Sequence, residues 1–539
     1  MFVKCETYKN KIYYTSLNED YNSEFKVIED FKIEAFKESP LGKWKGLINN
    51  EPLKKVEFDS VSKYNNFLYK NKDKVFNNIK PEYQYIRYNR ENETPDKKLR
   101  IWLWDIEADV MPDGSFPDPY KYEELPSITL MQVSEFDTKK KIILGWKRDT
   151  EVYKLFPNCI YKKFDNEVDM INAFIKLYRS RKVNILTAHF GNNFDFPYIV
   201  KRCNNLGINY KQLSPFNEFK TEKYDKSADE KYDIEKPIGA YWIDYVDVYK
   251  KLNQGSRESF SLGFLANYEG VEAKLDYTVL GYKNIKDLMA GKFSEDYCDD
   301  KENSEVYQAW LDKDEERVKQ LSYDIFVKYG ILDVVVMQEL EEKMKMFETL
   351  IASSQKMGCN IDDSLGTTEA WTIYVYNDLY KDNIALPAKK EENENDIYHG
   401  GYVFAIVGIH RYVLTEDVTS QYPHNIMALG MSPESYIKRE NIPKDLYEEI
   451  KELHNEDYPE DVVINWSIDK KNRVTELLQK YNIAMSINGA CFDRNVKGVI
   501  PKLVEEVFNE RKVFKDLKSK ASSDIAKIKE EIARRNCNV

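Results

Sequence analysis

Apolar and polar residues are grouped along the first 345 positions in a pattern that predicts strands and helices in alternation. Residues 1 to about 98 mix strand-like pieces such as 11–15 with a polar helical stretch around 60–79. Residues 99–107 then form a continuous apolar run ending in carboxylates, which is the profile of a buried central strand. Further elements are expected as strands at 128–133, 141–146 and 183–188 and a helix at 167–179. This alternation predicts an α/β domain through about residue 345.

The remaining pattern predicts charged insertions and a long terminal helix. Residues 286–318 are rich in acids and lysines, which is typical of a solvated helical insertion. Residues 384–396 form a charged connector, and residues 401–414 return to a strand-like pattern. From Pro501 to about Ala533 apolar residues recur at a helical period, with the proline at a plausible first-turn position.

Length and composition indicate a multi-domain globular protein. The chain has 539 residues, enough for roughly three to four domains with their own cores. Its 42% apolar and 14% aromatic content excludes wholesale disorder and a collagen-like protein. The net charge is −12, from 80 basic and 92 acidic residues, which excludes a globally basic, histone-like protein. An acidic total does not exclude nucleic acid as a substrate, because phosphate contacts depend on local patches.

Several function classes are not supported by the sequence. Seven cysteines without a C-x-x-C pair favour a reducing cytosol and indicate neither a disulfide framework nor a zinc ribbon. No apolar run resembles a signal peptide or approaches a membrane span, so a cytoplasmic protein without membrane contact is expected. The chain contains neither a P-loop nor a Rossmann fingerprint.

Carboxylates at three places in the α/β region suggest a metal site. Asp105 and Glu107 end the buried strand and, being two residues apart, project from the same face. Asp195 follows another apolar strand, and Tyr329 and Asp333 share one helix face at i and i+4. Each feature alone is typical of ordinary packing and surface charge. Together the four carboxylates can hold two divalent ions, and the tyrosine can orient an attacking water, which suits in-line hydrolysis of a phosphodiester.

In these motifs the chain resembles the proofreading 3′–5′ exonuclease of family B DNA polymerases. Asp105 with Glu107 matches the first exonuclease motif, Asp195 the second, and Tyr329 with Asp333 the third. The stretches Phe116-Pro-Asp-Pro, Ser259-Phe-Ser-Leu-Gly-Phe and Lys274-Leu-Asp look like the tailed-phage branch. One position departs from the pattern, because Phe190 stands where the second motif usually has asparagine. The resemblance implies a ribonuclease H-like exonuclease domain with Mg²⁺ or Mn²⁺, two ions per active site.

A second set of motifs resembles the polymerase part of the same family. The stretch Asp417-Val-Thr-Ser-Gln-Tyr422-Pro matches D-x-x-S-x-Y-P, with Gln421 where leucine is commonest. The resemblance implies that Asp417 and the Val418 backbone bind metal, and that Ser420 and Tyr422 bind the nucleotide. Tyr398, Gly400 and Gly401 resemble an element that touches DNA, and Arg511 and Lys515 lie one helical turn apart, where they suit a triphosphate.

The resemblance implies a division into five segments. These are an N-terminal domain (1–98), the exonuclease (99–345), a connector returning to the N-terminal domain (346–395), a partial palm (396–497) and a first fingers helix (498–539). The family's second fingers helix, K-x-x-x-N-S-x-Y-G, and its D-T-D hairpin are absent from the sequence. A two-metal polymerase site needs a second palm carboxylate, so the sequence favours the N-terminal portion of a split phage-type polymerase.

The resemblance also implies the partners. They are primer–template and single-stranded DNA, deoxynucleoside triphosphates, a C-terminal polymerase chain carrying the rest of palm, fingers and thumb, and a sliding clamp reached through that chain. Two other interpretations stay open, namely a stand-alone 3′–5′ exonuclease and a nucleic-acid-binding regulator that uses residues 1–98. A phage-encoded protein of this kind would act in the host cytoplasm.

Overall fold

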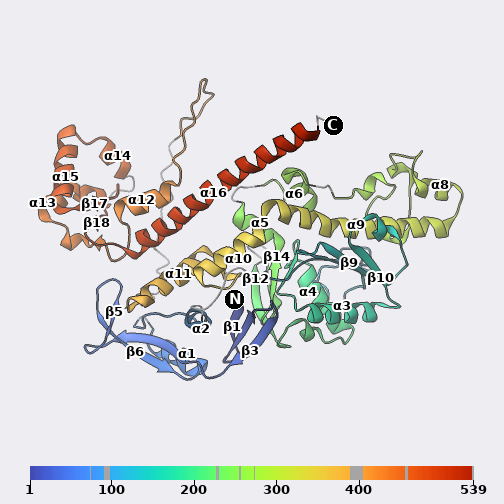
Figure 1. Ribbon diagram of the computed structural model, residues 1–539, viewed down its shortest axis with the longest axis horizontal. Coiled ribbons are helices and arrows are strands. Elements are labelled where there is room, and N and C mark those ends of the chain that lie inside the picture. Colours follow the sequence, from blue (N-terminus) through green and yellow to red (C-terminus); the bar gives the residue numbers. More distant parts are fainter. Residues whose placement is uncertain are drawn as a thin grey trace. The chain divides into compact units, whose positions relative to one another are not determined.

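The computed structural model describes residues 1–72, 74–89, 98–225, 230–253, 257–271, 274–388, 405–455 and 459–536, with side chains to residue 528. The chain divides into two compact units (Figure 1). The first comprises residues 1–34, 58–65 and 79–374, and the second comprises residues 35–57, 66–78 and 375–539. The expected multi-domain α/β fold is confirmed.

The first unit is built around a six-stranded sheet in the order β10-β9-β8-β7-β11-β14. The strands are β7 (Ile101–Ala108), β8 (Ile128–Glu135), β9 (Lys140–Gly145), β10 (Cys159–Lys163), β11 (Ile185–Ala188) and β14 (Tyr241–Asp244). β7 pairs antiparallel with β8 and parallel with β11. The expected buried central strand is therefore confirmed, and its carboxyl end lies beside the carboxyl end of β11.

The two faces of β7 pack against different helices. Trp102, Trp104 and Ile106 belong to a core with α3 (Glu167–Arg181) and α4 (Asp195–Asn205). Ile101 and Leu103 face the opposite way, into a core with α5 (Tyr245–Leu252) and the long helix α9 (Glu315–Met344). Strand alternation therefore places Asp105 and Glu107 on the α9 side of the sheet.

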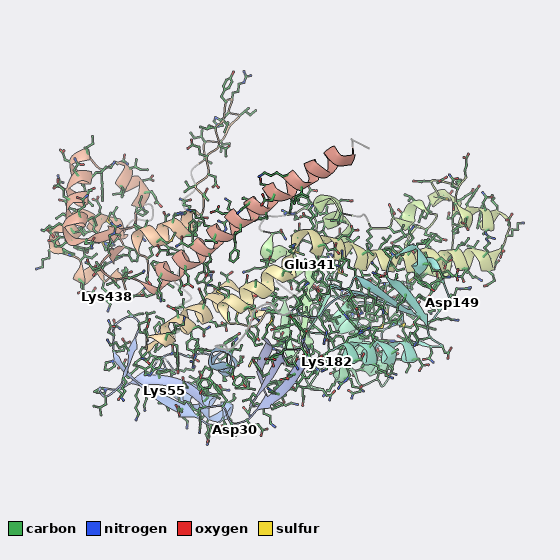
Figure 2. All side chains as sticks on the ribbon, in the orientation of Figure 1. Asp30, Lys55, Asp149, Lys182, Glu341 and Lys438 are labelled. Atoms are coloured by element: carbon green, nitrogen blue, oxygen red, sulfur yellow. The ribbon has the colours of Figure 1, made fainter. Side chains whose placement is uncertain are left out.

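Helix α9 ends in a sharp turn that is fixed by its own side chains. Lys345 adopts a left-handed conformation with φ of 53° and joins α9 to α10 (Met346–Met357). Glu341, labelled in Figure 2, is buried, and its Oε1 accepts a hydrogen bond from the Phe347 backbone N–H at 2.7 Å. This carboxylate satisfies a free amide in the first turn of α10.

The N-terminal residues and a hairpin complete the first unit. β1 (Phe2–Tyr8), β2 (Lys11–Leu17) and β3 (Ser23–Ile28) form an antiparallel meander. β12 (Phe219–Asp225) and β13 (Lys231–Pro237) form a two-stranded antiparallel ribbon between α4 and β14.

The segment 286–318 is less solvated than its charge suggested. It forms parts of α7 (Ile285–Ala290) and α9, with α8 (Glu305–Leu311) between them. Leu288, Val306 and Ala309 are buried in a core with α9. The charged residues that dominate the composition therefore cover only the outer face of an insertion that packs on the domain.

The second unit holds the later part of the chain. Its four-stranded sheet has the order β15-β5-β6-β4, from β4 (Ile33–Glu38), β5 (Trp44–Gly46), β6 (Pro52–Phe58) and β15 (Ile384–Ala385), the last following α11 (Thr367–Lys381). Further along are α12 (Gln421–Leu429), α13 (Lys444–Ile450), α15 (Ile468–Tyr481) and the small sheet β16-β18-β17 (Tyr436–Ile437, Cys491–Asp493, Ile483–Met485). The expected terminal helix is present as α16 (Val499–Asn536).

The strand expected at 401–414 is not found in the part of it that the structure describes. Residues 405–414 contain no strand, and Ile406, Val407, Ile409, Tyr412, Val413 and Leu414 are exposed. An apolar run forms a strand only where a neighbouring strand satisfies its backbone, and no described strand pairs with this one. Among the described helices, none is both long and apolar enough to cross a membrane.

Candidate active site

Three carboxylates from distant parts of the chain meet at the α9 face of β7. Asp105 and Glu107 come from the end of the strand, and Asp333 comes from the middle of α9. Each offers one oxygen, and these three oxygens lie within 4.8 Å of one another. The sequence grouped these residues correctly because strand alternation and the helix position both constrain their direction.

Asp195 joins the same region from the other side of β7. It opens α4, after β11. Its Oδ1 accepts a hydrogen bond from the Ile106 backbone N–H at 3.2 Å. Ile106 is the residue between Asp105 and Glu107. Asp195 is therefore adjacent to the group of three rather than part of it.

The carboxylates repel one another in a poorly solvated place. Burial raises the pKa of Asp105 well above its usual range, and the charges of Asp195 and Asp333 raise it further. Burial and the charge of Asp333 raise the pKa of Glu107 to about 8. Carboxyl groups in such surroundings favour protons or cations at close range.

Lys274 is the cation that the fold itself supplies. Its Nζ lies 2.9 Å from Asp333 Oδ2 and 4.3 Å from the centre of the Tyr329 ring. Burial opposes the charge of this lysine, but the charge and hydrogen bond of Asp333, together with the charges of Glu107 and Asp105, outweigh burial and raise the lysine pKa. One ammonium group does not balance four neighbouring carboxyl groups, so additional positive charge, such as a metal ion, would stabilise the site.

Tyr329 lies one helical turn before Asp333, as the sequence predicted. Burial raises the pKa of its phenol, and the charges of Asp333 and Glu107 add to the shift. Its ring contacts that of Tyr277 edge to face, with 5.5 Å between centroids. The phenol is therefore neutral at physiological pH and can donate a hydrogen bond.

Sequence reasoning missed Gln132 and Gly330. Gln132 lies in the middle of β8, and its Nε2 donates a hydrogen bond to Asp105 Oδ2 at 3.3 Å. A Cβ at Gly330 on α9 would lie 2.2 Å from that same Nε2. Glycine thus lets the helix approach the glutamine that holds Asp105. A polar residue inside the apolar run 128–133 was the available signal.

The loop before Asp195 contains the departure at Phe190. This residue has a φ of 57°, a left-handed conformation that costs a non-glycine residue energy. Nearby, the side chain and the backbone N–H of Asn192 make three hydrogen bonds. Lys236 Nζ donates to its Oδ1 at 2.5 Å, its backbone N–H donates to Asp244 Oδ2 at 2.9 Å, and its Nδ2 donates to Asp247 Oδ2 at 3.3 Å. Like Lys236, Tyr224 of the hairpin β12–β13 reaches this loop, because it donates a hydrogen bond to the Asn193 side chain.

The donor set fits a hard divalent cation. All candidate ligand atoms are carboxylate oxygens, which Mg²⁺ and Mn²⁺ prefer. Asp333 Oδ1 is buried and has no hydrogen-bond partner among the described residues. A buried oxygen without a donor is costly unless a cation or water meets it. Asp105, Glu107 and Asp333, with Asp195 beside them, would hold such ions.

The described residues expected to form the polymerase site belong to no cluster of three or more acidic side chains that could hold a metal ion, among the parts of the chain that the structure describes. Asp417 and Val418 are exposed in a segment without regular structure, and Asp417 belongs to no group of potential metal ligands within the described ranges. Ser420 precedes α12 with a φ of 54°, and Tyr422 in its first turn is 77% exposed. Tyr398, Gly400 and Gly401 lie outside the described residues.

Arg511 and Lys515 are exposed along α16. This helix packs against α12 through an edge-to-face contact of His424 and Phe508, with 4.8 Å between ring centroids. Its first turn is held by Ser432, whose Oγ accepts from the Ile500 N–H at 3.3 Å. The helix bearing the two cations and the helix bearing Tyr422 are thus in direct contact.

Comparison with known proteins agrees with the resemblance to family B DNA polymerases. Residues 59–262 match the family model for the DNA polymerase family B exonuclease domain, and residues 369–532 match that for DNA polymerase family B. The DNA-directed DNA polymerase of Enterobacteria phage T4 is 24% identical over 464 residues, 81% of this chain and 44% of that protein. The DNA-directed DNA polymerase of Escherichia phage RB69 is 23% identical over 84% of this chain and 46% of its own length. A Thermococcus DNA polymerase is 23% identical over 68% of this chain and 41% of its own length. The chain thus spans less than half the length of the curated relatives it matches.

Proposed function

Because the chain belongs to the family B DNA polymerases, we propose that the site at the end of β7 is a 3′–5′ exonuclease that removes nucleotides from single-stranded DNA. The observation that carries the proposal is the convergence of Asp105, Glu107 and Asp333 within 4.8 Å beside Asp195. Proofreading requires hydrolysis of the terminal phosphodiester, and this set of oxygens suits that chemistry.

Each residue of the site has a role that its position allows. Mg²⁺ or Mn²⁺, when bound, would polarise the scissile phosphate and lower the pKa of water. Tyr329, whose phenol is neutral and one turn from Asp333, orients the attacking water by donating a hydrogen bond. Lys274 lies against Asp333 and stabilises negative charge that develops on the phosphate. Gln132 keeps the Asp105 carboxylate in place.

Aromatic rings beside the site suit single-stranded DNA. Phe116 is 67% exposed and packs against Phe194, the residue before Asp195, with 5.1 Å between ring centroids. Tyr120 stacks on Tyr232 of the hairpin at 4.3 Å between centroids. Bases of a single strand stack on such rings without sequence preference. The substrate is therefore a 3′-terminal single strand that crosses these rings before reaching the carboxylates.

A labelled oligonucleotide tests the polarity of this reaction. With Mg²⁺ or Mn²⁺ present, an oligonucleotide labelled at its 5′ end should shorten stepwise, whereas one labelled at its 3′ end should lose its label as mononucleotide in the first step. Release of the 5′ label first, or internal cuts, would contradict the proposal. Binding without any cleavage would favour the alternative of a nucleic-acid-binding regulator.

We further propose that the chain is one part of a DNA-directed DNA polymerase. Asp417 and the Val418 backbone would hold metal, and Ser420 and Tyr422 would contact the incoming nucleotide. The contact between α12 and α16, which brings Tyr422's helix against the helix of Arg511 and Lys515, supports this arrangement. Asp417 belongs to no group of three or more potential metal ligands within the described ranges. A separate C-terminal chain would therefore complete the site and connect it to a sliding clamp, in the host cytoplasm.

Primer extension separates the split polymerase from a stand-alone exonuclease. The chain alone should not extend a primer, because two ions need more negatively charged ligands than one carboxylate supplies. A partner chain carrying the remaining palm should restore synthesis, and Asp417→Ala should then abolish synthesis while exonuclease activity persists. Robust extension by this chain alone would contradict the split. Exonuclease activity that no candidate partner converts to synthesis would favour the stand-alone enzyme.

A further inference from the structure

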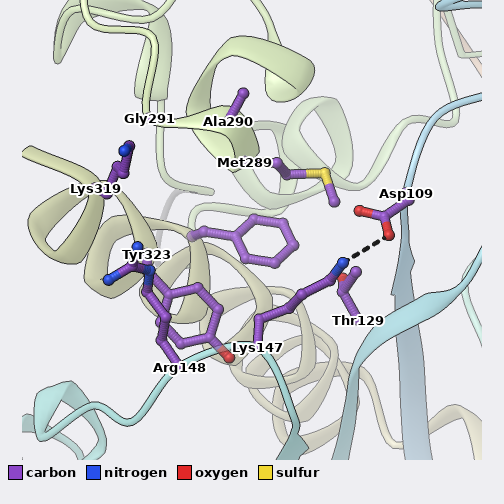
Figure 3. Close-up of a pocket in the computed structure, with 10 residues that line it drawn as sticks. Asp109, Thr129, Lys147, Arg148, Met289, Ala290, Gly291, Lys319 and Tyr323 are labelled. Carbon is purple, nitrogen blue, oxygen red and sulfur yellow. Dashed lines mark hydrogen bonds and ion pairs between the residues drawn. The ribbon is translucent and has the colours of Figure 1, made fainter. Parts of the chain in front are cut away.

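A hollow of about 240 Å³ lies beside the carboxylate site and belongs to none of the motifs (Figure 3). Its walls come from the end of β7, from β8 and β9 and their following turns, from α7 and from α9. The lining residues are Asp109, Thr129, Lys147, Arg148, Met289, Ala290, Gly291, Lys319, Tyr323 and Phe326.

The hollow continues the two walls of the carboxylate site. Asp109 follows Glu107 by two residues, and Thr129 Oγ1 donates a hydrogen bond to the Glu107 carbonyl at 3.0 Å. On α9, Lys319, Tyr323 and Phe326 are spaced so that their face of the helix continues to Asp333. Asp333 lies seven positions after Phe326, a rise of about 10 Å along a helix. This distance is comparable to the length of one nucleotide, so a nucleotide that leaves the carboxylates can enter the hollow directly.

The lining carries more positive than negative charge. Three of its side chains are cations and one, Asp109, is an acid. Lys147 pairs with Asp109 at 3.0 Å, while Arg148 and Lys319 both pair with Glu316 at 3.3 Å. The Glu316 side chain is 73% exposed, and ion pairs of this kind contribute little. A phosphate can therefore replace Glu316 as the partner of both cations at small cost.

Most of the uncharged lining is apolar or aromatic and suits a base or sugar. Phe326 is buried in the core of α9, and Met289 comes from α7 on the opposite wall, with its sulfur directed into the hollow in Figure 3. Tyr323 stands beside Arg148 in the same view. The combination of a cationic end and an apolar side in a small volume matches a mononucleotide better than a longer strand.

We propose that this hollow binds the 2′-deoxynucleoside 5′-monophosphate that the exonuclease releases, with Arg148 and Lys319 holding its phosphate. The choice of ligand rests on the proposed exonuclease function. The released nucleotide binds in the hollow before it leaves the protein. Free nucleotide from solution therefore competes with it for the hollow.

Calorimetric titration of the full chain with deoxythymidine monophosphate in EDTA tests binding at the hollow, because chelation removes metal-mediated binding at the carboxylates. The wild-type chain and the Asp105→Ala/Glu107→Ala variant should bind alike. Arg148→Gln/Lys319→Gln should weaken binding about tenfold or more, the scale of losing charge-assisted hydrogen bonds. Lys343→Gln is the matched control, since Lys343 is a half-exposed, ion-paired lysine on α9 outside the hollow. It should bind as the wild type does.

Two further ligands and one activity measurement complete the test. Deoxythymidine without phosphate should not bind detectably, and a thymidine trinucleotide should bind more weakly than the monophosphate. Equal affinity of wild type and Arg148→Gln/Lys319→Gln for the monophosphate, or preference for the trinucleotide, would overturn the assignment. If the monophosphate binds through Arg148 and Lys319 but the chain has no nuclease activity, the exonuclease proposal is refuted and the nucleotide site is supported. If the chain has nuclease activity but no such binding, the nucleotide site is refuted and the exonuclease proposal is supported.

Discussion

The buried ammonium of Lys236 donates a hydrogen bond to Asn192 Oδ1 at 2.5 Å. Lys236 lies at the base of the β12–β13 hairpin, and Asn192 lies in the loop that leads to Asp195. The same ammonium donates to the Trp242 carbonyl at 2.8 Å and lies 4.7 Å from the centre of the Phe196 ring. Burial lowers the pKa of this lysine to about 8, although acidic neighbours such as Glu222 and Asp244 oppose the shift. The hairpin and the Asp195 loop are thus joined by a contact that the exonuclease motifs do not include.

We expect Lys236→Met to slow nucleotide release about tenfold by loosening the position of Asp195, a scale consistent with small misplacements of reacting groups. Methionine fills similar volume but cannot donate to Asn192. The rate under single-turnover conditions and the Mn²⁺ concentration for half-maximal activity should both be measured. A purely structural role would lower the unfolding temperature without changing the metal requirement. Lys223→Met is the control, because Lys223 is an exposed hairpin lysine paired with Asp233. Identical kinetics of the two variants would refute the positioning role.

Divalent metal should stabilise the chain increasingly as pH rises. In the folded chain the pKa of Glu107 is about 8 rather than its ordinary 4.5, because the site is buried and acidic. The folded state therefore retains a proton that the unfolded state loses, and without metal the free energy of unfolding falls as pH rises from about 4.5 to about 8. A bound metal ion replaces this proton. The unfolding temperature with Mg²⁺ or Mn²⁺ should therefore exceed that with EDTA by an amount that grows as pH rises from about 4.5 to about 8.

The variant Asp105→Asn/Glu107→Gln provides the control for this pH effect. Its amides cannot titrate, so its unfolding temperature in EDTA should depend less on pH than that of the wild type. Its unfolding temperature should also rise little when metal is added. A metal-induced shift of wild-type size in this variant would place the ions elsewhere.

His189 should destabilise the fold on the acid side. Burial lowers its pKa from 6.5 to about 4, and the nearby charge of Lys274 adds to this effect, against the hydrogen bond between Nε2 and the Phe260 carbonyl at 2.8 Å. The unfolded state binds a proton more readily, so stability is lost as pH falls from about 6.5 to about 4, by at most about 3 kcal/mol. Urea unfolding of wild type and His189→Gln at pH 7 and pH 5 should show a smaller loss in the variant. Equal losses would mean that the imidazole is not kept neutral.

The convergence of the carboxylates was predictable from the sequence because these residues are fixed by local geometry. Asp105 and Glu107 share a strand face, and Tyr329 and Asp333 share a helix face, so each pair's direction follows from its own element. Lys236 and Gln132 could not be assigned in this way, since their contacts with Asn192 and Asp105 cross between elements. Nothing in the spacing of the sequence encodes those distances.

The same reasoning failed where an element depends on its neighbours. The apolar residues 405–414 have strand composition, but they are exposed and pair with no described strand. By contrast, α16 follows its local period, and the expected helix is present although Phe514 and Leu517 on it are exposed. A helix satisfies its own backbone and a strand does not, which explains why one prediction succeeded and the other did not.

The central claim is that Asp105 and Glu107 anchor the metal ions of a 3′–5′ exonuclease. Its most direct test is the single-turnover rate at which the chain releases the 3′-terminal nucleotide of single-stranded DNA with Mg²⁺, measured for the wild type, for Asp105→Ala/Glu107→Ala, and for Glu151→Gln, an exposed acid outside the site. The double variant should lose several orders of magnitude in rate, the scale of losing metal-assisted catalysis, while Glu151→Gln should match the wild type. A double variant that released nucleotide at nearly the wild-type rate would contradict the account.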